Sequence, residues 1–314
     1  MLFVRGKSLR PKVLGLLFGA VAALLPAVVG AAEGRIAVAS KIDTEGALLG
    51  NMILSLLAAH GLAVENKLQL GPTNIVRAAI LAGQIDIYPE YTGNGALFFH
   101  LEQDPVWKDW AQGAAKVATL DREKNHLVWL APAPANNTWV IAVRRDLAER
   151  HGLKTMNDFA KYLAGGGRIK LAASAEFVES PSALPAFEAT YGFKLSDSQL
   201  LTLSGGNTSA TLRAAAEGMS GVNAAMAYGT DGALAALGLV ALADDKRAQV
   251  VYAPAPVVRE AVLREHPEIP KVLDPVFATL SLETLQKLNA EIAVDGEDAG
   301  AVAVAYLKSK DLLP

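Results

Sequence analysis

The sequence predicts an α/β protein built from two lobes. Short apolar runs typical of strands alternate with longer segments of helical period, which is the pattern of βαβ units. The alternation forms two separate series, and the second begins near Trp139. Residues 33–314, which follow a predicted signal sequence, exceed the length of one average domain. Together these observations indicate two α/β lobes.

The first series contains three expected strands with two helices between them. The strands are residues 35–39, 63–70 and 85–88, and the helices are residues 47–60 and 74–82, ended by Gly61 and Gly83. Strands that alternate with helices of this length predict a sheet buried on both faces.

The second series resembles the first at its third strand. Its expected strands are residues 139–143, 169–173, 199–203 and 224–227. Tyr91 in the first series and Tyr228 in the second both lie just past an expected strand. Ligands of open α/β sheets bind beyond the carboxyl ends of strands, so both tyrosines are expected to point into a shared cleft.

Residues 1–32 are expected to be a cleaved signal peptide. A basic start precedes an apolar stretch over residues 13–29, and small residues follow at 30–32. The alternative is an uncleaved signal anchor, which Pro26 and the polar residues 33–35 disfavour.

Composition excludes several classes of function. Removal of residues 1–32 takes away four of the 29 basic side chains and no acidic one, which leaves 25 basic against 32 acidic side chains and a net charge of about −7. No basic cluster remains for nucleic acid. The absence of cysteine excludes thiol catalysis, disulfides and thiolate zinc sites. The histidines form no HExxH motif and there is no Walker A motif, so neither an enzyme, a metal nor a cofactor is expected.

Aromatic side chains are the most informative candidates for a site. Tyr88, Tyr91, Trp139, Tyr228 and Tyr252 lie at or beside expected strand ends. Several aromatic faces around a methylated ammonium stabilise it through cation–π interactions without a formal anion. Ordinary packing of tyrosines at a lobe edge is the alternative.

Lys41 follows the first expected strand and precedes a helix. Its ammonium and the nearby amide groups are placed to hold a ligand carboxylate, whereas the alternative is a solvated lysine. Asp43 or Thr44, followed by Gly46, is a plausible cap for that helix, which is a structural role.

Asp86 and Glu90 are not expected to form a catalytic pair. Four residues along a strand span about 13 Å, and a turn is expected between them. Structural roles are expected instead: Asp86 accepts from a backbone amide, and Glu90 anchors a turn at Pro89.

Several motifs carry a resemblance to a known family. Residues 39–45, 70–73 and, above all, 86–93 (DIYPEYTG) resemble the glycine betaine/choline-binding receptors of osmoprotectant ABC importers. Residues 131–139 and 224–232 are similar to the OsmF (YehZ)-like branch of that family. The resemblance covers essentially the whole chain after the signal peptide.

This resemblance implies a type II periplasmic-binding fold, in which two α/β lobes joined by two crossing hinge strands close over a ligand cleft. Residues 33–138 would form the first part of lobe 1, residues 139–252 lobe 2, and residues 253–314 would return to lobe 1. It further implies a periplasmic monomer, without a cofactor, that delivers its ligand to an ABC permease and ATPase.

The resemblance also implies the residues that contact the ligand. An aromatic cage would comprise Tyr91, Trp139, Tyr228 and Tyr252. The carboxylate of a betaine would meet Lys41, Asn94 and Ser180. Relatives commonly have Arg at the position of Ser180, so weaker betaine binding, or another ligand such as choline, is expected here.

Three alternatives stay open. The same fold can bind an amino acid or a polyamine, with an acidic residue meeting the ligand ammonium, and the candidates are Asp43, Glu90, Glu176 and Asp231. An exported enzyme on this fold and a ligand-sensing module of a membrane receptor are the other two.

Overall fold

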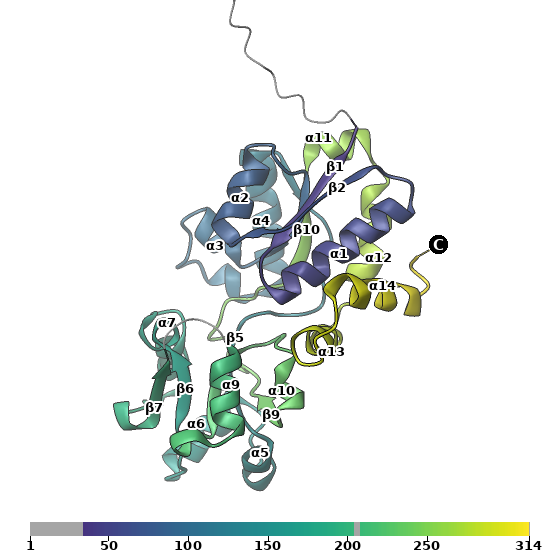
Figure 1. The fold of residues 1–314 in the computed structure, drawn as a ribbon. Helices are drawn as coiled ribbons and strands as arrows, with labels where there is room; N and C mark the ends of the chain where they lie inside the picture. Colours follow the sequence, from purple (N-terminus) through teal and green to yellow (C-terminus); the bar gives the residue numbers. More distant parts are fainter. Residues whose placement is uncertain (1–33, 204–207, 314) are drawn as a thin grey trace, which may run out of the picture. The chain divides into compact units, whose positions relative to one another are not determined.

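The computed structural model describes residues 34–203 and 208–313 (Figure 1). The expected signal peptide, residues 1–32, therefore lies outside the described residues. In the described ranges, no helix combines the length and the apolar character needed to cross a membrane.

The described chain forms two five-stranded sheets of matching design. In spatial order, the first sheet contains β2 (Val64–Gly71), β1 (Ile36–Lys41), β3 (Ile87–Tyr91), β10 (Pro254–Arg259) and β4 (Leu127–Trp129). The second contains β7 (Leu200–Leu203), β6 (Leu171–Ser174), β8 (Ala224–Tyr228), β5 (Trp139–Arg144) and β9 (Leu239–Ala241). The first three strands of each order are parallel, and the fourth runs antiparallel to both its neighbours. The two predicted α/β lobes are confirmed, whereas the βαβ pattern did not predict that the fourth strand of each order runs antiparallel to its neighbours.

Helices surround both sheets (Figure 1). Those from the parts of the chain that build the first sheet are α1 (Thr44–Ala59), α2 (Thr73–Leu81), α3 (Asn94–Phe98), α4 (Trp110–Asn125), α11 (Glu260–Glu265), α12 (Ile269–Phe277), α13 (Leu282–Ala293) and α14 (Ala299–Ser309). Those from the part that builds the second are α5 (Arg145–His151), α6 (Met156–Ala164), α7 (Ala175–Glu179), α8 (Leu184–Tyr191), α9 (Thr208–Ala216) and α10 (Ala233–Ala236). Short 3-10 helices are η1 (Pro105–Lys108), η2 (Asp197–Gln199) and η3 (Met219–Gly221).

Each sheet is buried on both faces, as predicted. Successive residues of a strand point to opposite faces. Accordingly, Val38 of β1 packs in a core with α1, α12, α13 and α14, whereas its neighbour Ala37 packs with α2 on the other face. In β5, Ile141 joins the core beneath α5 to α8, and Ala142 joins the core beneath α9 and α10.

Local sequence signals fix the ends of α1 and α2. The carboxylate of Asp43 accepts a hydrogen bond from the Gly46 amide at 2.7 Å and caps α1, as expected. Gly61 and Gly83 follow α1 and α2 with φ of +82° and +69°. Such left-handed conformations favour glycine and end helices at the predicted positions.

The segment around Pro89 differs from its prediction. It was expected to be a turn anchored by Glu90, but β3 continues through Pro89 to Tyr91. The turn prediction is wrong because pairing with β10, whose Pro256 lies opposite Pro89, extends the strand past a residue that lacks an amide hydrogen. Asp86 does accept a backbone amide, that of Ala37 at 2.9 Å.

Candidate ligand-binding site

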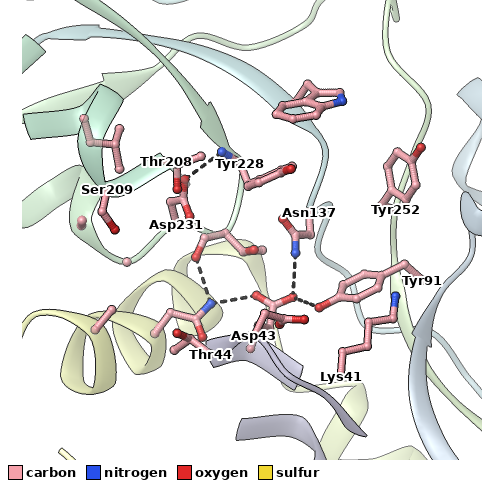
Figure 2. Close-up of a pocket in the computed structure, with 18 of the residues that line it drawn as sticks. Lys41, Asp43, Thr44, Tyr91, Asn137, Thr208, Ser209, Tyr228, Asp231 and Tyr252 are labelled. Atoms are coloured by element: carbon pink, nitrogen blue, oxygen red, sulfur yellow. Dashed lines mark hydrogen bonds between the residues drawn. The ribbon is translucent and has the colours of Figure 1, made fainter. Parts of the chain in front are cut away.

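A cavity of about 730 Å³ is lined by residues from both sheets and their helices (Figure 2). Lys41, Tyr91 and Tyr228 are the last residues of β1, β3 and β8. The cavity therefore lies at the carboxyl ends of parallel strands, where open α/β sheets bind ligands. The sequence predicted that both tyrosines lie just past their strands, but each is the last residue of its strand.

All four aromatic residues predicted for the cage line this cavity. Figure 2 shows Tyr228 on one side and Tyr91 with Tyr252 on the other. Strand pairing brings them together, because Trp139 pairs with Tyr228 across β5 and β8, and Tyr91 lies opposite the start of β10. Tyr88 is different: it is fully buried in the core beneath α2, so its expected place at the ligand edge is wrong.

Some of the aromatic faces already have partners. Trp139 and Tyr228 stack with ring centroids 4.5 Å apart and an interplanar angle of 25°. Phe177 packs against Trp139 at 5.4 Å in a T-shaped arrangement. Lys41 places its ammonium 4.5 Å from the ring centroid of Tyr91. One ring of the predicted cage, that of Tyr91, therefore already contacts a cation of the protein itself, the Lys41 ammonium.

The predicted carboxylate contacts have a different environment from the one expected. Lys41 and Asn94 line the cavity, but both donate to Glu90, at 2.5 and 2.7 Å. Lys41 is buried, so the alternative of a solvated lysine is wrong. Ser180 is the C-cap that follows α7, and its hydroxyl lies 3.0 Å from that of Ser182. It is not one of the residues that line the cavity.

Glu45 is a lining residue that the sequence did not single out. Its buried carboxylate accepts from the Tyr91 hydroxyl at 2.8 Å, Asn289 Nδ2 at 2.8 Å and Asn137 Nδ2 at 3.2 Å. Burial raises the pKa of Glu45 despite these hydrogen bonds. In the sequence, an acid in the first turn of a helix reads only as a favourable charge near the helix dipole, so its contacts with distant residues gave no signal.

The cavity has an excess of acidic side chains. Among the described residues that line it, four are acidic, Asp43, Glu45, Glu176 and Asp231, and Lys41 is the single Lys or Arg. Asp231 accepts the Tyr228 amide at 2.8 Å, and burial raises its pKa. Burial also raises the pKa of the Tyr228 and Tyr252 hydroxyls, which keeps both neutral at physiological pH. Aromatic rings beside unbalanced carboxylates suit a small cation.

Across residues 34–203 and 208–313, no three His, Asp or Glu side chains are grouped to hold a metal ion.

Comparison with known proteins gives consistent matches. The family model described as the substrate binding domain of ABC-type glycine betaine transport systems matches residues 34–309. The glycine betaine-binding protein YehZ of Escherichia coli is 61% identical over 89% of this chain and 92% of its own length. The glycine-betaine-binding protein of Pseudomonas aeruginosa is 31% identical over 94% of this chain and 93% of its own length. The structure of apo YehZ from Escherichia coli superimposes with a TM-score of 0.83 at 60% identity, covering 88% of this chain and 99% of that one.

Proposed function

The chain belongs to the family of substrate-binding domains of ABC-type glycine betaine transport systems, and we propose that its cavity binds a small quaternary-ammonium solute such as glycine betaine or choline. The observation that carries this proposal is the convergence of Tyr91, Trp139, Tyr228 and Tyr252 on one acidic cavity. Two relatives named for glycine betaine binding support the choice of solute.

The geometry gives each group a role in this proposal. Each aromatic face that meets the methylated ammonium contributes about 0.5–2 kcal/mol, with the larger values where water is excluded. Asp43, Glu176 and Asp231 add a negative potential that attracts a cation into the cavity. The ring of Tyr252 completes the wall opposite Tyr228 (Figure 2).

Export and delivery are parts of the same proposal. We expect residues 1–32 to direct the chain to the periplasm and to be removed there. The monomeric receptor would then present its ligand to an ABC permease driven by an ATPase. A ligand that contacts both lobes would favour their closed arrangement, because it binds that arrangement more tightly.

The acidic lining favours one second candidate, a linear polyamine. Its ammonium groups carry N–H donors that the carboxylates of Asp43, Glu176 and Asp231 can accept. A quaternary ammonium has no such donors and depends on the aromatic rings, so aromatic substitutions separate the two candidates.

Isothermal titration of ligand-free protein with glycine betaine, choline, proline and spermidine tests the proposal. We expect saturable binding of glycine betaine or choline, weakened about tenfold or more in Tyr228→Ala, because a desolvated cation–π contact is worth up to about 2 kcal/mol. Tyr162→Ala is the matched control, since Tyr162 packs beside His151 outside the cavity. Binding of spermidine alone, or unchanged affinity in Tyr228→Ala, would refute the proposal.

A further inference from the structure

We propose that Glu90, which lies behind the wall of the cavity, determines whether the site favours quaternary-ammonium ligands with a carboxylate or without one. This inference rests on the proposed function. Glu90 is a positioning residue, because it does not line the cavity itself. It acts through Lys41 and Asn94, which do line the cavity.

Four hydrogen bonds converge on the Glu90 carboxylate, which is completely buried in β3. Oε1 accepts from Lys41 Nζ at 2.5 Å, from Asn94 Nδ2 at 2.7 Å and from the Tyr91 amide at 2.7 Å. Oε2 accepts from the Tyr88 hydroxyl at 3.1 Å. All four partners are donors, so the site around Glu90 is built for an ionised carboxylate.

Glu90 therefore uses the donors that a ligand carboxylate would need. Lys41 and Asn94 are two of the three side chains predicted to hold that carboxylate, and each already donates to Glu90. The buried pair of Lys41 and Glu90 carries no net charge, so an incoming carboxylate meets the ammonium with an opposing charge directly behind it. The repulsion between the ligand carboxylate and the Glu90 carboxylate is stronger in this poorly solvated wall than in water.

The same pair affects the cationic end of the ligand. Lys41 lies 4.5 Å from the centre of the Tyr91 ring, where a ligand ammonium would compete with it. Glu90 balances that resident charge, so the Lys41 ammonium does not leave the wall with a net positive charge that would repel a second cation. With the pair intact, the wall disfavours the ligand's carboxylate and tolerates its ammonium.

Charge substitutions on either side of the pair should move ligand preference in opposite directions. Glu90→Gln keeps the shape but leaves Lys41 with a net positive charge, so the ratio of choline affinity to glycine betaine affinity should fall about tenfold, or about 1.4 kcal/mol. Lys41→Met leaves Glu90 as an unpaired anion, so the same ratio should rise. The double substitution should return the ratio towards that of the wild type.

The experiment measures both dissociation constants by calorimetry in the full mature chain. Glu188→Gln is the matched control: Glu188 is a buried carboxylate that pairs with Lys194 at 2.5 Å, and neither residue lines the cavity. It should lower stability and leave the ratio unchanged. Glu90→Asp, which retains the charge, should keep a ratio closer to the wild type than Glu90→Gln does.

The outcomes separate this inference from the function beneath it. A protein that binds both ligands with an unchanged ratio in Glu90→Gln and Lys41→Met overturns the role of Glu90 and leaves the proposed function standing. A wild type that binds neither ligand overturns both. If Glu90→Gln does not fold, the rise expected for Lys41→Met decides the matter, and a fall or no change there overturns the inference.

Discussion

Helix α13 contacts the loop that follows β8, and Gly232→Ala tests how tightly it does so. A Cβ at Gly232 would lie 2.2 Å from the Ala290 amide nitrogen and 2.4 Å from the Asn289 carbonyl carbon. Both are backbone atoms of α13, so no side chain can rotate away. Gly232 has a φ of −66°, which any residue adopts, so the cost of the substitution comes from the contact alone.

The structure allows the magnitude to be worked out. Relief of the contact moves α13 away from the loop and breaks two hydrogen bonds, Asn289 Nδ2 to Thr230 O at 3.0 Å and Gln286 Nε2 to Gly229 O at 2.7 Å. Overpacking costs about 1–3 kcal/mol and each lost hydrogen bond about 0.5–1.5 kcal/mol. The less flexible unfolded chain returns about 0.4–1 kcal/mol, so a net loss of about 3 kcal/mol in the free energy of unfolding is expected.

Urea denaturation measures this loss as a lower midpoint with an unchanged slope. Gly165→Ala is the control, since Gly165 has a φ of −82° and a Cβ there would meet its nearest atoms at 3.5 and 3.6 Å, which is ordinary contact. That variant should stay within about 1 kcal/mol of the wild type. A loss in Gly232→Ala no larger than in the control would refute the reasoning.

Two further predictions concern the start of α1. Asp43→Ala removes the hydrogen bond from the Gly46 amide and should lower the free energy of unfolding by about 1 kcal/mol. Asp43→Asn retains an oxygen that can accept this hydrogen bond and should lose less. Equal losses in the two variants would contradict the capping role of Asp43. Glu45→Gln tests a dependence on pH. Because burial raises the pKa of Glu45 above its unfolded value, its contribution to wild-type stability is complete below the unfolded pKa and is lost as pH rises through the folded one. Urea curves at pH 4 and pH 7 should therefore show the stability of Glu45→Gln gaining on the wild type towards pH 7, and a constant difference would contradict the raised pKa.

Features that depend on local sequence were predictable. The strands of both series, the glycine ends of α1 and α2 and the cap at Asp43 all follow from signals within a few residues. The meeting of Tyr91 and Tyr228 at one cavity was also predictable, because two similar series imply two similar sheet edges.

Features that depend on distant pairing were not predictable. Pro89 signals a turn by itself, and only the return of β10 from far along the chain makes it part of a strand. The residues around Glu90 are the same whether the segment forms a turn or a strand. They therefore do not show that Glu90 meets Lys41, which lies 49 positions away in the sequence. Asn289 donates a hydrogen bond to Glu45, which lies 244 positions away in the sequence. Residues 253–314 were expected to pack on the first lobe, but α13, which belongs to this segment, also contacts the loop after β8 in the second lobe.

The pairing of β5 with β8 has a consequence for how this chain can change in evolution. Trp139 stacks on Tyr228 because the two residues are direct partners in the antiparallel register. Neighbouring strand residues face opposite sides, so a shift of one residue would turn Trp139 towards α9 and α10 and put Val140 in its place. Insertions and deletions within β5 or β8 are thus more damaging than substitutions there, and we expect the lengths of these two strands to be inherited more faithfully than their composition.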